Sequence, residues 1–414
     1  MACVADSAQV GSDPVPVLII GAGPAGLASA ACLKRRGIEA LVLEAAPALA
    51  HAWRNHYDRL HLHTVKKRSH LPGMPFAKEL TRYPARADVV AYLEAYAAKF
   101  GITPRTGEPV RRLRAADGAS DDASGGAPDG APDGFVVETA RAVYRARAVV
   151  VATGFGRVPN PERLPDQERF RGVLLHSSAY RNAAAFVGQR VLVVGAGNTG
   201  AEIALDLAER GAHPTLSVRA PVNVVPREFL GLPIQVTSIR LRKAPTKLAD
   251  AIGRMASWLS FGNLARYGLP RPAMGPISAI KLRRRIPLID VGTIAAIKRG
   301  QIAVKPGVAR LTERGAAFSD SSSADFDAVV LATGFRPALA EFVDLPGVLD
   351  DQGYPRDRHG GGGIPNLFFV GYQIAATGHL REIGIEAQAM AAELAPGADA
   401  GSQQKPGPRP FISP

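Results

Sequence analysis

Cysteine is almost absent from this chain. Only two cysteines, Cys3 and Cys32, occur among its 414 residues. Their spacing forms neither a CxxC nor a CxxxxC pair, so the sequence argues against a disulfide framework and offers no redox-active dithiol. A chain without such a framework is typical of a reducing compartment, and we expect a cytoplasmic protein.

Long apolar runs are missing as well. The apolar stretch from Val15 to Leu33 is broken by glycines and proline, and no basic segment precedes it. A membrane helix needs about 20 consecutive apolar residues, and a secretory signal needs a basic start. We therefore predict no membrane span and no signal peptide, and interpret this stretch as a buried strand followed by a core helix.

What the chain does contain is two glycine-rich turns, each placed where an apolar strand leads into a helix. The turns are Gly21-Ala22-Gly23-Pro24-Ala25-Gly26, which follows residues 15–20, and Gly195-Ala196-Gly197-Asn198-Thr199-Gly200, which follows residues 191–194. One such turn is a weak signal. Two of them, a domain's length apart and both in strand–turn–helix context, predict two bound dinucleotides.

The residues of the first turn suit a pyrophosphate. Gly21 permits the tight turn, Gly23 leaves room for the phosphates, and Gly26 lets the next helix pack closely on the strand. That helix begins at Pro24 and Ala25, and its free N–H groups and positive dipole end point toward the phosphates.

The second turn repeats this arrangement. Gly195, Gly197 and Gly200 take the same three roles, and the helix begins near Asn198 and Thr199. A second pyrophosphate is therefore expected at this helix start.

The residues that follow the two next strands distinguish the dinucleotides. Glu44 can accept hydrogen bonds from ribose hydroxyls and would repel a 2′-phosphate, so the first turn fits FAD or NAD, and its N-terminal position favours FAD. Arg219 stands at the equivalent place after the second turn and can pair with a 2′-phosphate, with Arg227 as another candidate. We predict NADPH at the second turn; a solvated surface charge is the alternative for Arg219.

Two near-identical segments, 148–154 and 328–334, each form an apolar run that ends in Ala-Thr-Gly. They suit the points where the chain crosses between two dinucleotide domains, and they place Thr153 and Thr333 beside the cofactors. The apolar run that ends at Gly371 suits the closing strand of the FAD domain, next to the ribityl chain.

We therefore predict an α/β fold of two dinucleotide-binding, Rossmann-like domains, with the NADPH domain inserted into the FAD domain. The expected parts are a flexible N-terminus (1–14), the FAD-binding domain (15–160 and 329–395), the NADPH-binding domain (161–328) and a disordered tail (396–414). Low-complexity residues 117–134 are expected to form a flexible loop. Residues 222–289 would cover a substrate channel or support a dimer contact.

The chain is basic, with a net charge of +13. Such a charge can indicate nucleic acid or anionic lipid as a partner. The basic residues are spread along the chain, and no aromatic-interleaved recognition module accompanies the densest runs. We expect attraction of NADPH and no nucleic-acid partner.

Several classes of enzyme bind two dinucleotides. Pyridine-nucleotide disulfide reductases need a cysteine pair near the flavin, which this chain lacks. Ferredoxin-type reductases remain open, and a flavin-free NAD(P) scaffold would leave the first turn and Glu44 without a purpose.

Longer motifs narrow the choice. Residues 170–180 match the pattern FxGxxxHSxxY of flavin-containing monooxygenases, residues 53–63 match the WxxxYDRLxLH segment of plant YUCCA-type enzymes, and residues 331–335 match the LATGY-like motif. Over about residues 15–392 the chain resembles this family. The resemblance assigns Trp53 and Arg54 to the cofactor site.

The resemblance implies a class B flavoprotein monooxygenase without a metal. NADPH would reduce FAD, O₂ would add to give a C4a-(hydro)peroxyflavin, and a small organic substrate would be oxygenated, with a 2-oxo acid such as indole-3-pyruvate as one option. Baeyer–Villiger, nitrogen or sulfur oxygenation is the alternative, although Baeyer–Villiger enzymes more usually carry Thr and Trp where this chain has Ser177 and Tyr180. A flavoprotein that acts as an NADPH oxidase or reductase is the alternative from a different class of function. A homodimer is one option for the assembly.

The resemblance also implies roles for single residues. His176 lies in the signature at the hinge between domains, which implies a conformational role. His63, followed by Thr64, stands where animal-type members carry an asparagine near the flavin, so one of the two would face the isoalloxazine. Asn198 would contact the pyridine nucleotide, cap its helix, or do both.

Overall fold

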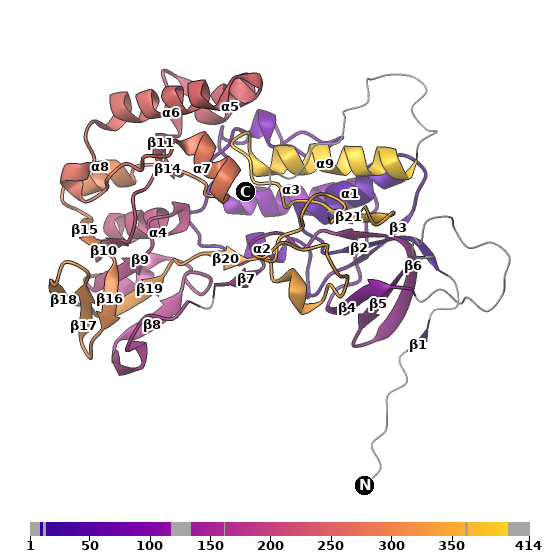
Figure 1. Cartoon of the computed structure of the whole chain (residues 1–414), viewed down its shortest axis with the longest axis horizontal. Helices are drawn as coiled ribbons and strands as arrows, with labels where there is room; N and C mark the ends of the chain where they lie inside the picture. Colours follow the sequence, from indigo (N-terminus) through magenta and orange to yellow (C-terminus); the bar gives the residue numbers. More distant parts are fainter. Residues whose placement is uncertain (1–8, 11–13, 117–133, 161, 361–362, 396–414) are drawn as a thin grey trace, which may run out of the picture.

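The computed structural model describes residues 9–10, 14–116, 134–160, 162–360 and 363–395. The two largest β-sheets lie side by side, and each has helices on one face (Figure 1). Cys3, the tail 396–414 and all but the last residue of the low-complexity segment 117–134 lie outside the described residues.

The first sheet combines a parallel centre with an antiparallel extension. Its strands are β1 (Gln9–Val10), β2 (Val15–Ile20), β3 (Ala40–Leu43), β4 (Val110–Ala115), β5 (Phe135–Thr139), β6 (Ala142–Val151) and β21 (Leu367–Phe369). The order is β3-β2-β6-β5-β4, and β1 and β21 also pair with β6. Strands β2, β3 and β21 run parallel to β6, whereas β5 and β4 continue from β6 as an antiparallel meander.

Helices α1 (Pro24–Lys34), α3 (Arg86–Lys99) and α9 (His379–Leu394) cover one face of this sheet (Figure 1). Helix α1 is rich in alanine and is buried on nearly all sides, so its small side chains allow α9 to approach closely. On the opposite face, side chains of the sheet, β4 and β5 included, share a second core with a C-terminal segment that contains Leu339 and Phe342. The C-terminal part of the chain thus completes the first domain.

The second sheet is parallel throughout. Its strands, in spatial order, are β15 (Ala303–Pro306), β10 (His213–Val218), β9 (Arg190–Val194), β19 (Ala328–Leu331) and β8 (Val173–His176). One face packs against α4 (Asn198–Glu209) and α8 (Thr293–Lys298). The other is covered by a small antiparallel sheet of β16 (Val308–Leu311), β17 (Gly315–Phe318) and β18 (Ser323–Asp325). Both sheets are therefore Rossmann-like, as predicted.

The chain crosses between the domains twice, and the two crossings lie together. β7 (Val158–Pro159) follows the first sheet, β20 (Phe335–Arg336) follows the second, and they pair antiparallel. The second domain is thus inserted into the first.

Two details differ from the predicted boundaries. β1 pairs with β6, so Gln9 and Val10 of the N-terminus that we expected to be flexible belong to the sheet. Strand β19 lies in the second sheet, so this sheet continues past residue 328, where we expected the NADPH domain to end. We propose that the chain returns from the second domain to the first after β19.

Residues 222–290 form an insert on the second domain. Its elements are β11 (Val224–Pro226), β12 (Glu228–Phe229), β13 (Leu232–Pro233), α5 (Ile234–Arg240), α6 (Thr246–Phe261), α7 (Pro276–Arg283) and β14 (Leu288–Asp290). β11 pairs with β14, and β12 with β13. Asp250 of α6 accepts hydrogen bonds from the N–H groups of Ile277 (2.7 Å) and Ser278 (3.1 Å), which fixes the start of α7 against α6.

The remaining helices are short. They are α2 (His51–Arg54) and 3-10 helices at Lys66–Arg68, Gln167–Arg169, Ala183–Phe186, Leu241–Lys243, Ala265–Tyr267 and Leu339–Glu341. Across the described ranges, no helix combines the length and the apolar character that crossing a bilayer requires.

Candidate active site

The first glycine-rich turn, between β2 and α1, uses its three glycines differently. Gly21 has a φ of +107°, and a Cβ there would lie 2.8 Å from the carbonyl oxygen of Ala152. A Cβ on Gly26 would lie 1.8 Å from the carbonyl oxygen of Gly21, whereas one on Gly23 would meet no atom within 4 Å. The backbone itself therefore requires Gly21 and Gly26, while Gly23 leaves open space at the start of α1.

The second turn, between β9 and α4, is built in the same way. Gly195 has a φ of +114°, and its Cβ would lie 2.5 Å from the carbonyl oxygen of Ala332. A Cβ on Gly200 would lie 1.9 Å from the carbonyl oxygen of Gly195, and one on Gly197 would again meet no atom within 4 Å. Both turns thus leave space at the position where a pyrophosphate approaches the backbone.

Both helices begin directly at these turns. Gly23 is the N-cap of α1, with Pro24 and Ala25 in the first turn, and Gly197 is the N-cap of α4, with Thr199 in its first turn. A glycine N-cap has no side chain that could accept hydrogen bonds from the first N–H groups. These groups and the helix dipole therefore remain free to bind an anion.

Each turn rests on one of the two Ala-Thr-Gly segments. Thr153 lies beside the first turn, with its Oγ1 2.8 Å from the hydroxyl oxygen of Tyr372. The hydroxyl of Thr333, beside the second turn, is buried and has no hydrogen-bond partner within the described structure. An unpartnered buried hydroxyl costs roughly 1–3 kcal/mol, so Thr333 fits a polar group of a bound ligand.

Glu44 follows β3 and lies against the first turn. Its Oε2 accepts a hydrogen bond from the N–H of Ala22 at 2.7 Å, and its Oε1 accepts one from the N–H of Ala46 at 2.8 Å. A carboxylate oxygen has a further lone pair, so each can also accept a hydrogen bond from a ribose hydroxyl.

Arg219 follows β10 at the equivalent place of the second domain. Its Nη1 pairs with Oε1 of Glu162 at 2.5 Å, and the side chain is 75% exposed. Exposed ion pairs contribute little to stability, so a 2′-phosphate can replace Glu162 as the partner of this guanidinium.

Arg227 links the insert to the first domain. Its guanidinium lies 4.2 Å from the ring centroid of Tyr83, a cation–π geometry. The hydroxyl of Tyr83 donates a hydrogen bond to Glu228 at 2.6 Å. In this structure the guanidinium of Arg227 contacts Tyr83. Its role at the 2′-phosphate therefore stays a proposal.

His63 contacts the second domain. Its Nε2 lies 2.5 Å from Oε1 of Glu202, and this carboxylate is only 3% exposed. Glu202 comes from α4, the helix that begins at the second turn, so the bond joins the loop after β3 and α2 to the NADPH-binding element. Sequence reasoning missed Glu202, although an acid two residues after Gly200, between Ala201 and Ile203, was an available signal.

Two more acids share this face of α4. Glu202, Asp206 and Glu209 are spaced four and three residues apart and so lie on one side of the helix. The hydroxyl of Tyr180 donates to Asp206 at 2.6 Å, and Arg59 donates to both oxygens of Glu209 at 2.9 and 2.7 Å. Arg59 and His63 thereby hold the first domain against α4.

The other predicted residues of this loop region are engaged by protein groups. The hydroxyl of Thr64 lies 2.7 Å from the hydroxyl of Ser69. Arg54 pairs with Glu94 of α3, and Trp53 packs against the first core. Their roles toward the cofactors stay predictions.

His176 lies at the junction of the domains, at the end of β8. Its Nε2 donates to the carbonyl oxygen of Gly334 (3.2 Å), and its Nδ1 accepts a hydrogen bond from the N–H of Ser178 (3.1 Å). Burial lowers the pKa of this imidazole, so it is neutral at neutral pH. Its position beside the returning crossing fits a conformational role better than acid–base chemistry.

The sequence allowed Asn198 to be the N-cap of α4. In the structure the N-cap is Gly197. The amide of Asn198 instead donates to the carbonyl oxygen of Pro287 (3.1 Å) and accepts from the N–H of Ile289 (2.8 Å). The side chain therefore fixes β14 of the insert against the second turn. Its contact with a pyridine nucleotide stays a prediction.

Gly371 follows β21 and lies against the start of α1. Its φ is +89°, and a Cβ there would lie 3.0 Å from the Cβ of Ala25. Its N–H donates a hydrogen bond to Oε2 of Glu386 at 2.6 Å. The closing strand thus reaches the start of α1, and its place beside the ribityl chain stays a prediction.

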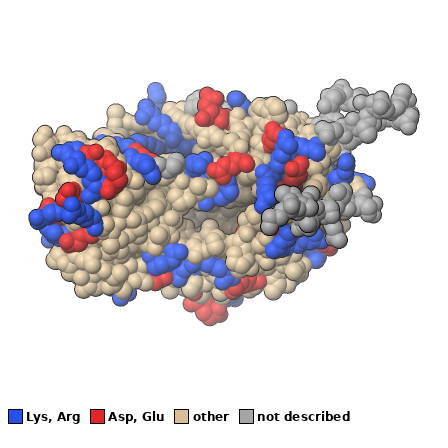
Figure 2. All heavy atoms as spheres, turned by 90° about the horizontal axis from the view of Figure 1, so that it is seen from below, with Lys and Arg blue, Asp and Glu red and all other residues tan. Residues whose placement is uncertain are grey.

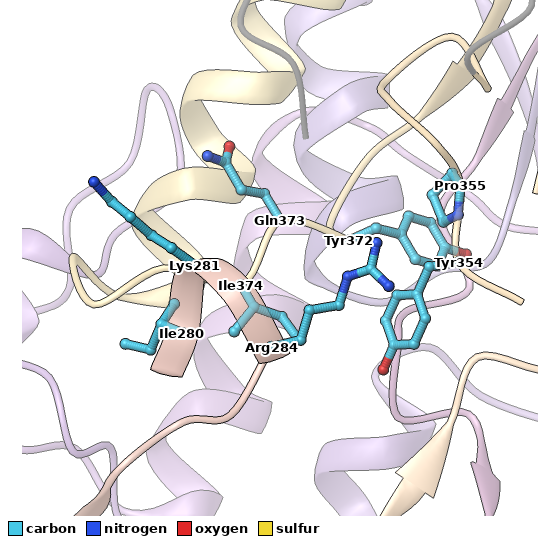
Figure 3. Close-up of a pocket in the computed structure, with 8 residues that line it drawn as sticks. All are labelled: Ile280, Lys281, Arg284, Tyr354, Pro355, Tyr372, Gln373 and Ile374. Atoms are coloured by element: carbon cyan, nitrogen blue, oxygen red, sulfur yellow. The ribbon is translucent and has the colours of Figure 1, made fainter. Parts of the chain in front are cut away.

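A narrow crevice marks the contact between the insert and the C-terminal part of the first domain (Figure 3). Arg284, just after α7, lies 4.5 Å from the ring centroid of Tyr354 and pairs with Asp350 at 2.6 Å. The crevice encloses only about 20 Å³, room for a single water, so it cannot hold an organic substrate. Figure 2 shows a hollow near the middle of the face seen from below, with basic and acidic side chains around it.

These residues fit two dinucleotides. Each sheet has a turn with open space at its middle glycine, a helix start without a capping side chain, and a polar residue after the next strand that suits its ribose. Two such sites on two sheets, one domain inserted into the other, define a flavoprotein oxidoreductase that also binds a pyridine dinucleotide.

Comparisons with known proteins agree with this class. Residues 18–227 match the family model described as pyridine nucleotide-disulphide oxidoreductase. The chain is 41% identical over 350 residues to indole-3-pyruvate monooxygenase YUCCA1 of Oryza sativa subsp. japonica, covering 84% of this chain and 82% of that protein. It is 39% identical over 330 residues to indole-3-pyruvate monooxygenase YUCCA6 of Arabidopsis thaliana, covering 79% and 77%.

Solved structures share the fold. A flavin-containing monooxygenase from Stenotrophomonas maltophilia superposes with a TM-score of 0.67 at 24% identity, covering 93% of this chain and 99% of that one. An oxidised steroid monooxygenase bound to NADP superposes with a TM-score of 0.70 at 19% identity, covering 92% and 85%.

The chain belongs to the flavin-containing monooxygenase family, with YUCCA-type enzymes among its relatives. It is an NADPH- and FAD-dependent monooxygenase, and a small molecule and O₂ are its substrates. The chain contains no CxxC or CxxxxC cysteine pair. Cys32 is buried, and burial raises the pKa of its thiol to about 11.

Proposed function

We propose that this monooxygenase converts indole-3-pyruvate, or a closely related aryl 2-oxo acid, to the acid that is one carbon shorter. The observation that carries the proposal is the 41% identity, over 84% of the chain, with a relative named for this substrate. The net charge of +13 also favours an anionic substrate. Arg381, which could hold a carboxylate, instead pairs with Glu382, so we assign it no substrate contact.

When bound, FAD and NADPH supply hydride transfer and the activation of O₂. The chain supplies binding and orientation. Gly23 and Gly197 leave room for the two pyrophosphates, and the first N–H groups of α1 and α4 bind them. Glu44 holds a ribose at the first site, and Arg219 holds a 2′-phosphate at the second.

Further residues would set the geometry between the two sites. We propose that His63 and Thr64 lie near the flavin edge, where the bond from His63 to Glu202 fixes the imidazole relative to the second turn. His176 would hold the returning crossing through the carbonyl oxygen of Gly334.

The direct test is product analysis with the purified holoenzyme. Indole-3-pyruvate, NADPH, a proton and O₂ should give indole-3-acetate, CO₂, NADP⁺ and water, with nearly one product molecule for each NADPH oxidised. A neutral ketone and a thioether serve as competing substrates. Lactone or sulfoxide formation without indole-3-acetate would support the alternative oxygenations, and hydrogen peroxide as the sole product would indicate an oxidase.

Arg219→Ala is expected to weaken NADPH binding by about tenfold and to leave NADH binding unchanged, because only NADPH carries the 2′-phosphate. Titration of each nucleotide against the oxidised holoenzyme measures both affinities. Arg310→Ala is the matched control, an exposed arginine of β16 in the same domain. An equal loss for NADPH and NADH would contradict the assignment.

A further inference from the structure

The excess positive charge of the protein is concentrated in the insert. Residues 222–290 contain twelve Lys and Arg and three acids, Glu228, Asp250 and Asp290, so nine of the thirteen net positive charges lie in the insert. Asp250 is buried at the start of α7 and contributes no surface charge opposite them. Basic residues do occur along the whole chain, as the sequence indicated, but outside the insert they are nearly balanced by acids.

The insert is also where the protein exposes apolar side chains. The described residues include eleven large apolar side chains that are exposed, and eight of them lie between Leu230 and Ile286. Four belong to α6, and we call them the outer face of α6: Leu248, Met255, Trp258 and Leu259. Trp258 is 59% exposed and Leu259 57%. Single exposed apolar residues are ordinary, but a contiguous set marks an interaction surface.

The outer face follows from the helical repeat. Leu248, Met255 and Leu259 are seven and four residues apart, so they form one stripe, and Trp258 lies next to it. Ala249 and Ala256 lie on the opposite side and are buried against the insert. Helix α6 therefore has two apolar sides, one packed against its own domain and one open.

Unpaired cations directly precede this face in the chain. Arg240, Arg242, Lys243 and Lys247 lie in the turns before and at the start of α6, and all four are exposed. None of them has an ion-pair partner among the residues that the structure describes. The combination of an exposed apolar stripe, a tryptophan and neighbouring cations is typical of helices that lie in a bilayer interface.

A groove opens beside the outer face. Met255 and Trp258 form part of its wall, Val224 contributes to its apolar lining, and Arg254 and Arg271 supply guanidinium groups. Its volume is about 340 Å³. Apolar walls next to guanidinium groups suit a molecule with an acyl chain and a phosphate.

We propose that the outer face of α6 docks this monooxygenase onto anionic phospholipid bilayers. The apolar stripe inserts to the depth of the lipid headgroups, and the four cations pair with lipid phosphates. The helix lies on the bilayer and does not span it. The surface is separate from the two dinucleotide sites, so the proposal is independent of the substrate.

The same residues argue against other occupants. A symmetric dimer through this face would place two cationic surfaces opposite each other, which is unfavourable. A nucleic acid would pair with the cations but would leave the leucines and Met255 without apolar partners.

The test is co-sedimentation of the full-length holoenzyme with vesicles of phosphatidylglycerol and phosphatidylcholine, compared with vesicles of phosphatidylcholine alone. We expect binding only to the anionic vesicles and release at high salt. The variants Leu259→Ser and Lys247→Glu should each weaken binding by about tenfold, with unchanged NADPH oxidation. Tryptophan emission should shift to the blue on binding, and Trp258→Phe should abolish the shift.

Two matched variants control for general electrostatic adsorption of a basic protein. Val187→Ser removes an apolar side chain that is 60% exposed elsewhere, and Lys298→Glu reverses an exposed charge at the end of α8. Both should bind vesicles like the wild type. The proposal is overturned if these controls lose as much affinity as the α6 variants, if anionic vesicles are not bound, or if the α6 variants abolish a dimer in sedimentation without lipid.

Discussion

Gly197→Ala is expected to weaken NADPH binding by at least about tenfold while the fold and the FAD content stay unchanged. A Cβ at this position meets no protein atom within 4 Å, and the backbone φ of −81° suits any residue. The added methyl group therefore collides only with the pyrophosphate. Titration with NADPH, the ratio of flavin to protein, and thermal unfolding measure the three properties.

Gly200→Ala provides the contrast within the same turn. Its Cβ would lie 1.9 Å from the carbonyl oxygen of Gly195, so the turn itself must shift. We expect a loss of roughly 3 kcal/mol in the free energy of unfolding, together with the loss of NADPH binding. If Gly197→Ala destabilised the protein as strongly as Gly200→Ala, the open space at Gly197 would not be a phosphate site.

Opposite pH dependences are expected from two buried groups on α9. Burial raises the pKa of Glu386 to about 7 and lowers the pKa of His379 to about 4. The folded protein holds the proton of Glu386 more tightly than the unfolded chain does, so the contribution of Glu386 to the free energy of unfolding falls as the pH rises from about 4.5 to 7. The folded protein holds the proton of His379 less tightly, so the contribution of His379 falls as the pH decreases from about 6.5 to 4.

Single variants should separate the two effects. Glu386→Gln removes the first, because an amide can still accept the hydrogen bond from Gly371, and it should raise the stability above pH 7 by roughly 3 kcal/mol. His379→Gln should remove the loss below pH 6. Denaturant unfolding of the holoenzyme between pH 4 and 8 measures both.

Glu393→Gln is the control for Glu386→Gln. Glu393 lies on the same helix but is partly exposed and paired with Arg358, so its replacement should change the stability by no more than about 1 kcal/mol at any pH. A parallel pH profile for Glu386→Gln and the wild type would show that the buried carboxyl is not ionised in this range.

Local patterns made most of the fold predictable. The strands at Val15–Ile20 and Ala40–Leu43 and the starts of α1 and α4 follow from apolar runs and glycine spacing, because all the residues that decide them are neighbours in the chain. The insertion of one domain into the other followed from the two Ala-Thr-Gly segments, because each of them is a recognisable local pattern even though they lie far apart in the chain.

Contacts between distant residues were not predictable. His63 and Glu202 are 139 residues apart, and nothing near either one indicates that they meet. The amide of Asn198 reaches Pro287 and Ile289 across the insert, so a helix start that looked like an N-cap serves to fix a strand. The concentration of positive charge in the insert is a different case, because the shortage of acids there can be counted in the sequence, and we did not predict it.

The paired crossings β7 and β20 have a consequence for how such an enzyme can be altered. Adjacent strands lie about 4.8 Å apart, so the chain enters and leaves the second, NADPH-binding domain at neighbouring points. A segment with neighbouring ends can be exchanged as a cassette without displacing the flavin half of the chain. Recombination at this ribbon could therefore change the choice of electron donor while the oxygenating half kept its substrate.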